Sequence, residues 1–146
     1  MTAIQVMGAL ALVLVILGTI FNFLIFLTCF LRLRKQVTFI FFLFLSVADT
    51  VALYGWNIVH FFVAFFGRGL ILSTIPSCRF VSFYQYVASQ TSAWILVLMS
   101  LERLLSILIK RWRLQIFKVK HAVISSFICV GIICLINSNV LFKYGH

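Results

Sequence analysis

Carboxylates are almost absent from this sequence, in which Asp49 and Glu102 are the only two acidic residues against 12 lysines and arginines. Only one proline occurs in 146 residues, and 10% of the chain is charged. Soluble domains are about a quarter charged, so an ordinary soluble domain is excluded. We also expect no enzyme, because no two carboxylates share a face and the sequence has neither a Gly-rich phosphate loop nor a His/Cys cluster with metal-ligand spacing.

Four long apolar stretches account for the low fraction of charged residues. They are residues 1–31 and 122–142, which carry no charge, residues 36–67 with only Asp49, and residues 80–109 with only Glu102 and Arg103. About 20 residues in a helix span a bilayer, and none of these stretches alternates like a barrel strand. We predict an all-α membrane protein, with one domain over 1–146 and helices at about 4–31, 37–66, 78–110 and 122–142.

Basic residues gather in two of the three predicted connections. Arg32, Arg34 and Lys35 follow the first span, and Lys110, Arg111, Arg113, Lys118 and Lys120 separate the third from the fourth. The middle connection has only Arg68 and Arg79. The positive-inside rule then predicts cytoplasmic basic loops and an extracellular N-terminus. Because the positive charge lies in short loops beside the membrane, we expect lipid and not nucleic acid as its partner.

Three polar residues in or near the predicted spans need an interpretation. Asp49 lies near mid-membrane, where an acid serves as an ion site or protonation switch, or stays neutral and only joins helices. Arg103, beside Glu102 near the inner end of the third span, has a function there or simply extends to the headgroups. Cys78 stands alone at the outer end, which suggests a disulfide partner elsewhere, in sequence beyond His146.

Five short motifs resemble helices 1 to 4 of a rhodopsin-like G-protein-coupled receptor. "GTIFN" places Asn22 four residues after Gly18, and "LSVAD" ends in Asp49 as the family's second helix does. "LERLLSI" is similar to the family's Asp-Arg-Tyr box, with Glu102 and Arg103 as its first two residues. Cys78 precedes Arg103 by 25 residues and Ser92 precedes it by 11, which are also the family's spacings. The family has seven helices, so we expect this chain to be a fragment holding the first four.

The resemblance implies a set of functional residues. Asp49, Ser92 and Asn22 would hold an allosteric sodium ion, with no other metal and no other cofactor. Glu102 would pair with Arg103 in the inactive state, and Arg103 would meet a heterotrimeric G protein on activation. Cys78 would form the family's extracellular disulfide bond. The implied location is the plasma membrane, with several spans and the N-terminus outside.

The resemblance also implies where a ligand binds. Gln85, Tyr86 and Ser89 occupy the ligand-facing stretch of the family's third helix, and Trp56 in the second helix extends the pocket. Amine receptors carry an aspartate at the position of Gln85. Glutamine there is similar to the neuropeptide branch, including the FMRFamide-like receptors of invertebrates, so we expect an extracellular peptide ligand. Gln85 as a plain interhelical hydrogen bonder is the alternative.

Two other classes of protein fit parts of the sequence. A four-span channel or transporter subunit would use Asp49 in its ion pathway. Such a subunit would need neither an outer partner for Cys78 nor the Glu102–Arg103 pair, which favours the receptor. A truncated receptor that binds full-length receptors and retains them in the endoplasmic reticulum is the other alternative.

Overall fold

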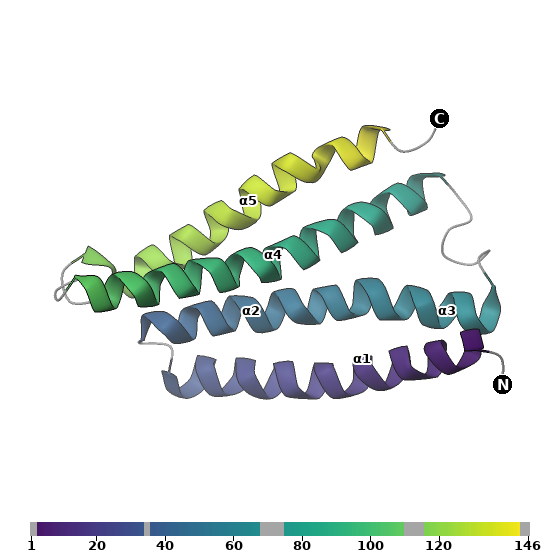
Figure 1. The fold of residues 1–146 in the computed structure, drawn as a ribbon, viewed down its shortest axis with the longest axis horizontal. Helices are drawn as coiled ribbons and strands as arrows, with labels where there is room; N and C mark the ends of the chain where they lie inside the picture. The colour runs from purple at the N-terminus through teal and green to yellow at the C-terminus, as the bar shows by residue number, and fades with distance from the viewer. Residues whose placement is uncertain (1–2, 34–35, 68–74, 110–115, 144–146) are drawn as a thin grey trace.

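The protein is a bundle of long helices. A computed structural model describes residues 3–33, 36–67, 75–109 and 116–143. The elements in chain order are α1 (Ala3–Thr28) with the π-helix η1 (Cys29–Leu33), α2 (Val37–Leu53), the π-helix η2 (Tyr54–Ile58), α3 (Val59–Phe66), α4 (Ile75–Leu108) and α5 (Val119–Lys143). They run up and down in an antiparallel arrangement, with α1, α2 and α4 side by side and α5 splayed away from them toward the C-terminal end (Figure 1).

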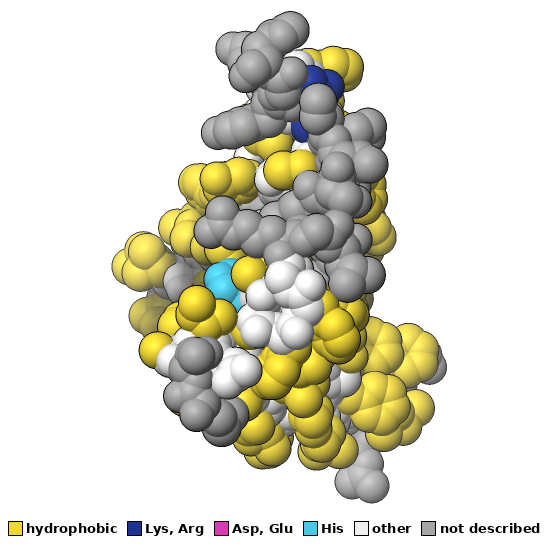
Figure 2. Space-filling model, turned by 90° about the vertical axis from the view of Figure 1, so that its right-hand side faces the viewer, with side chains coloured by type: hydrophobic (Ala, Val, Ile, Leu, Met, Phe, Trp, Pro, Cys, Tyr) yellow, Lys and Arg dark blue, Asp and Glu magenta, His cyan; other side chains and the backbone are white. Residues whose placement is uncertain are grey.

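The predicted four apolar spans are confirmed, so this is a multi-pass membrane protein. The helices that are long and apolar enough to cross a membrane cover Ala3–Leu31, Val37–Phe66, Cys78–Leu108 and Val119–Phe142. Hydrophobic side chains project around the flanks of the bundle when it is viewed from the end where α3 stops and α4 starts (Figure 2). Such a surface is unsuited to water and suits the hydrocarbon of a bilayer.

The ends of the helices differ from the predicted ends by up to three residues. α4 begins at Ile75 instead of Cys78, with Pro76 in its first turn, where a missing N–H leaves no intrahelical bond unmade. α5 begins at Val119 instead of residue 122. There the backbone N–H of Lys118 donates to Nδ1 of His121 at 3.2 Å, which caps the start of the helix. The predicted end of the third span, Lys110, lies outside the described residues.

The end of η1, the start of α2, the end of α4 and the start of α5 lie at the same end of the bundle (Figure 1). In the sequence, the segments between η1 and α2 and between α4 and α5 are the two basic ones. Most of the residues behind the orientation prediction (Arg34, Lys35, Lys110, Arg111 and Arg113) lie outside the described residues. The extracellular N-terminus therefore stays a prediction.

Small residues let α1 approach its neighbours closely. A Cβ atom built on Gly8 would lie 2.5 Å from Cβ of Ala64 in α3. A Cβ atom on Gly18 would overlap the side chain of Leu53 in α2. Helices in membranes associate largely through such van der Waals packing of small residues. The N-terminal half of α1 is thereby held against α3, and its middle against α2.

The best-packed part of the bundle is the end where α2 begins. Val37, Ile40 and Phe41 of α2 form a buried cluster with Ile95 of α4 and Ala122 of α5. The ring of Phe41 stacks on that of Phe117, with centroids 6.5 Å apart. This cluster ties α2, α4 and α5 together and leaves the polar residues of α2 farther along the bundle.

Candidate functional site

The second span is interrupted by η2, and this π-turn forms one side of the candidate site. A π-turn contains an extra residue, so carbonyl groups near it are offered to partners outside the helix. The hydroxyl of Tyr84 donates to the carbonyl oxygen of Val51 at 2.8 Å. Nε2 of Gln85 donates to the carbonyl oxygen of Gly55 at 2.7 Å. Two neighbouring side chains of α4 therefore support the interrupted stretch.

Gly55 is required for this close approach of α4. A Cβ atom at Gly55 would lie 2.7 Å from Cε1 of Tyr84 and 3.3 Å from Cγ of Gln85. A larger residue would push both side chains away from the carbonyl groups that they contact. The glycine therefore helps to set the position of α4 against the second span.

Trp56 and Ser89 join η2 to α4 one turn farther along. Nε1 of Trp56 donates to Oγ of Ser89 at 2.9 Å. The indole also stacks on the ring of His60, with centroids 6.2 Å apart. Nδ1 of His60 lies 2.6 Å from the carbonyl oxygen of Trp56, which only accepts, so this nitrogen carries the proton. Two of the predicted ligand-binding residues are thus in direct contact.

The other two predicted ligand residues have different surroundings. Gln85 is engaged with the backbone of η2, which is the interhelical hydrogen bond that we considered as its alternative role. Tyr86 is 45% exposed. Trp56 is 43% exposed, so its ring is accessible although its nitrogen is paired. The ligand-binding role of all four residues stays a prediction.

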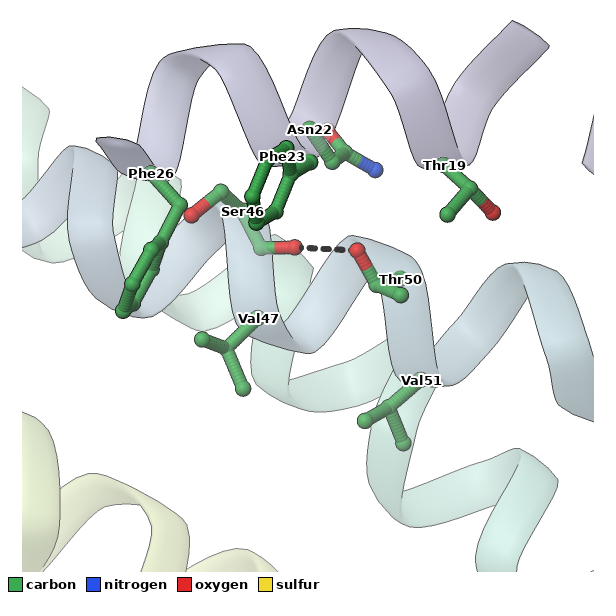
Figure 3. A pocket seen from close by; sticks show the side chains of 8 residues that line it. All are labelled: Thr19, Asn22, Phe23, Phe26, Ser46, Val47, Thr50 and Val51. Carbon is green, nitrogen blue, oxygen red and sulfur yellow. Dashed lines mark hydrogen bonds between the residues drawn. The ribbon is translucent and has the colours of Figure 1, made fainter. Parts of the chain in front are cut away.

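Asn22 and Asp49 line one shared hollow. This "Asp49 hollow" has a volume of about 400 Å³ and is lined by Asn22, Asp49, Ala52, Leu53, Trp56 and Asn57. Asn22 also lines a neighbouring groove between α1 and α2, which Figure 3 shows with Thr19 and Asn22 on the α1 side and Ser46 and Thr50 on the α2 side. In that groove Oγ1 of Thr50 donates to the carbonyl oxygen of Ser46 at 2.7 Å. Asn22 therefore stands at the junction of two hollows along α1.

The residue types around the Asp49 hollow include those that a hard cation such as sodium prefers. Asp49 carries a carboxylate, and Asn22 and Asn57 carry amide oxygens. Nδ2 of Asn57 donates to the carbonyl oxygen of Leu53 at 3.1 Å. Ser92, the third predicted ligand, is not among the residues that line the hollow. Its hydroxyl lies 3.4 Å from the carbonyl oxygen of Ala88 in its own helix.

Glu102 and Arg103 occupy contrasting environments near the C-terminal end of α4. Glu102 is 3% exposed, and its Oε1 accepts a hydrogen bond of 2.8 Å from Oγ of Ser106. Arg103 is exposed. The carboxylate is thus held inside the bundle while the guanidinium group reaches the surface. The predicted pairing of these two residues and the contact of Arg103 with a G protein stay predictions.

Cys78 is exposed near the start of α4. Within the described residues no disulfide bond is found, and Cys29, Cys129 and Cys134 are free as well. The disulfide bond that we predicted for Cys78 therefore stays a prediction.

Two residues of the site, Ser106 and Tyr84, were not predicted from the sequence. Ser106 lies four residues after Glu102, and this spacing on a helix could have revealed the pair. No spacing in the sequence indicates the role of Tyr84, because its contact with Val51 depends on how α2 and α4 pack. No protein-family model matches this chain, and no curated protein matches it significantly.

Proposed function

We propose that these helices are the first four of a rhodopsin-like G-protein-coupled receptor that binds an extracellular peptide and signals to a heterotrimeric G protein. The Asp49 hollow would hold an allosteric sodium ion, with Asn22 and Asn57 beside the carboxylate. Trp56, Ser89, Gln85 and Tyr86 would form part of the peptide site in the outer half of the bundle. The receptor would lie in the plasma membrane with its N-terminus outside.

The observation that supports this proposal most is the convergence of Asn22 and Asp49. The two residues come from different helices and are 27 positions apart, yet they line one hollow within the apolar spans. An acid in this setting is unfavourable unless it has a partner or a role. A cation among carboxylate and amide oxygens supplies that partner.

The test is sodium-dependent stability of the purified chain in lipid nanodiscs. Thermal unfolding is followed in sodium chloride and in choline chloride at equal ionic strength. Sodium at ten times its Kd would stabilise the folded chain by about 1.4 kcal/mol. We expect this effect to disappear in Asp49→Asn and to persist in Glu102→Gln, the matched change at the only other acid. Equal stability of the wild-type chain in the two salts would refute the sodium site.

A second function is favoured by one specific observation. Trp56 and Asn57 line the Asp49 hollow and also an outer hollow that contains His60 and Met7. Polar side chains thus continue from Asp49 toward the outer half of the bundle, as expected of an ion pathway in a channel or transporter subunit. Sodium flux into liposomes that contain the purified chain separates the two functions. Flux that Asp49→Asn abolishes favours the transport subunit, whereas sodium-dependent stability without flux favours the receptor.

A further inference from the structure

The side-chain amide of Gln90 joins α4 to α5 and keeps an unpaired N–H group. Nδ2 of Asn137 donates to Oε1 of Gln90 at 2.7 Å and to the carbonyl oxygen of Ile133 at 2.9 Å. Because a carbonyl group only accepts, these contacts determine which end of each amide is the nitrogen. Among the described residues, Nε2 of Gln90 has no hydrogen-bond partner. It is also not a fully buried unpaired atom, so it retains accessible surface.

Gln90 belongs to the wall of a groove between α4 and α5, which we name the α4–α5 groove. Its volume is about 540 Å³. The wall includes Trp94 of α4 and Ile132 of α5 and, within the described ranges, no residue of α1, α2 or α3. Trp94 is 54% exposed and Ile132 is 51% exposed, and both belong to apolar spans. The groove therefore opens on the outside of the bundle, where the hydrocarbon of the bilayer lies.

The depth of Gln90 in the membrane limits what can pair with its amide. Gln90 lies 12 residues after Cys78, or about 18 Å along the helix, well inside the third span. Hydrocarbon chains carry no acceptor and water is excluded at this depth, so an unpaired N–H group is unfavourable there. Polar side chains of another helix supply acceptors within a bilayer. The amide of Gln90 therefore favours a second helix over lipid as its neighbour.

We propose that the α4–α5 groove is the contact between two copies of this chain, in which Nε2 of each Gln90 donates to Oε1 of the other Gln90. Copies inserted in one membrane share one orientation, so a two-fold axis along the membrane normal places equivalent residues at equal depth. An amide is self-complementary, because Oε1 accepts from Asn137 and still has a free lone pair. Gln90 of the second copy is therefore an acceptor at the correct depth.

Trp94 adds apolar contact area beside the Gln90 pair. It lies four residues after Gln90, on the same face of α4. Tryptophan is usually enriched at the two membrane interfaces, so a half-exposed indole this deep in a span is unusual. Tryptophan is also among the side chains that contribute most to protein–protein contacts. The pairing uses only α4 and α5 and does not rest on the proposed receptor function.

The experiment measures resonance energy transfer between copies of the chain in the membranes of expressing cells. Donor and acceptor fluorescent proteins follow His146 on separate copies, and transfer is recorded over a range of surface densities. We expect transfer above the level of random encounter, from which a dimer Kd follows. Gln90→Leu keeps a side chain of similar size without the amide and should raise this Kd roughly 5- to 10-fold. Wild-type transfer at the random level would overturn the proposal and assign the groove to lipid.

Asn137→Leu is the matched control within one copy. It removes the bond between α4 and α5 but leaves both amide atoms of Gln90 available, so the dimer Kd should change by less than about twofold. An equal increase in Asn137→Leu and Gln90→Leu would overturn the proposal, because the bond inside one copy would then explain the effect. Trp94→Ala should also weaken the dimer, whereas Phe21→Ala, at a 61% exposed aromatic residue of α1, should not.

Two cysteines of α5 test which face forms the contact. Cys129 belongs to the wall of the α4–α5 groove, and Cys134 does not. In a chain that carries Cys29→Ser and Cys78→Ser, oxidation of the membranes with iodine joins the thiols of neighbouring copies. We expect a disulfide-linked dimer that Cys129→Ser abolishes and Cys134→Ser retains. A linked dimer that depends on Cys134 and not on Cys129 would place the contact on another face of α5 and overturn the proposal.

Discussion

Trp56 donates its indole hydrogen to the hydroxyl oxygen of Ser89 at 2.9 Å, and this bond joins the π-turn of the second span to α4. The residues are 33 positions apart and come from two different predicted helices. Their contact links the C-terminal half of the second span to the stretch of α4 that also supports η2 through Tyr84 and Gln85.

The energy of the Trp56–Ser89 bond is measurable with a double-mutant cycle. Trp56→Phe keeps an aromatic ring without the donor, and Ser89→Ala removes the acceptor. Interhelical hydrogen bonds in membranes contribute about 0.6 kcal/mol on average, so we expect a coupling energy of about that size. The free energy of unfolding of the four chains in mixed micelles provides the measurement. Strictly additive effects of the two changes would show that the bond contributes nothing.

The packing of α1 against α3 should fail when Gly8 gains a methyl group. The new Cβ atom would lie 2.5 Å from Cβ of Ala64, which has no rotamer to change. We expect Gly8→Ala to destabilise the folded chain by about 1–3 kcal/mol, as overpacking does elsewhere. Gly131→Ala is the matched control, because its added Cβ atom meets nothing within 4 Å. The two free energies of unfolding are compared, and equal values would contradict the close approach of α1 and α3.

Ser106 should stabilise the protein more than an ordinary serine on the same helix. Its hydroxyl lies 2.8 Å from the buried carboxylate oxygen of Glu102 and 2.7 Å from the backbone carbonyl oxygen of the same residue, whereas exposed Ser100 has the backbone contact alone among the bonds described, with Leu96. Because Ser106→Ala removes a donor to a buried acid, we expect it to reduce the free energy of unfolding by about 1–2 kcal/mol. Ser100→Ala should change it by less than about 0.5 kcal/mol. A smaller effect at Ser106 than at Ser100 would argue against the bond to Glu102.

The sequence alone predicted the spans well and their internal detail poorly. A run such as residues 36–67 identifies a spanning helix because it is long enough to cross a bilayer and is almost free of charge. The π-turn at Tyr54–Ile58 could not be predicted from that run, because one extra residue in a turn does not change the apolar composition of the helix. Of the predicted sodium ligands, Asn22 and Asp49 line one hollow, whereas Ser92 does not line it. The position of Ser92 depends on the rotation of α4, which spacing along one helix does not determine.

The orientation in the membrane is testable through Cys78. Its thiol is exposed, while Cys29 is 5% exposed and Cys129 and Cys134 lie inside an apolar span. We expect a membrane-impermeant maleimide to label intact cells at Cys78, and Cys78→Ser to abolish this labelling. Pre-treatment with a reductant shows whether the thiol is paired in the cell. Labelling that requires permeabilised cells would reverse the proposed orientation.

The π-turn η2 also has a consequence for how this span could change over evolutionary time. Each residue of an α-helix turns the chain by about 100°. Deleting a single residue within Tyr54–Ile58 would restore a regular helix but would rotate the residues beyond it, including His60, by much less than this angle, because the wider π-turn already takes up the extra residue. Asp49 and the buried cluster around Phe41 precede the turn and would keep their orientation. The loss of one codon could therefore remove the carbonyl groups that Tyr84 and Gln85 contact, while both halves of the span keep their present faces.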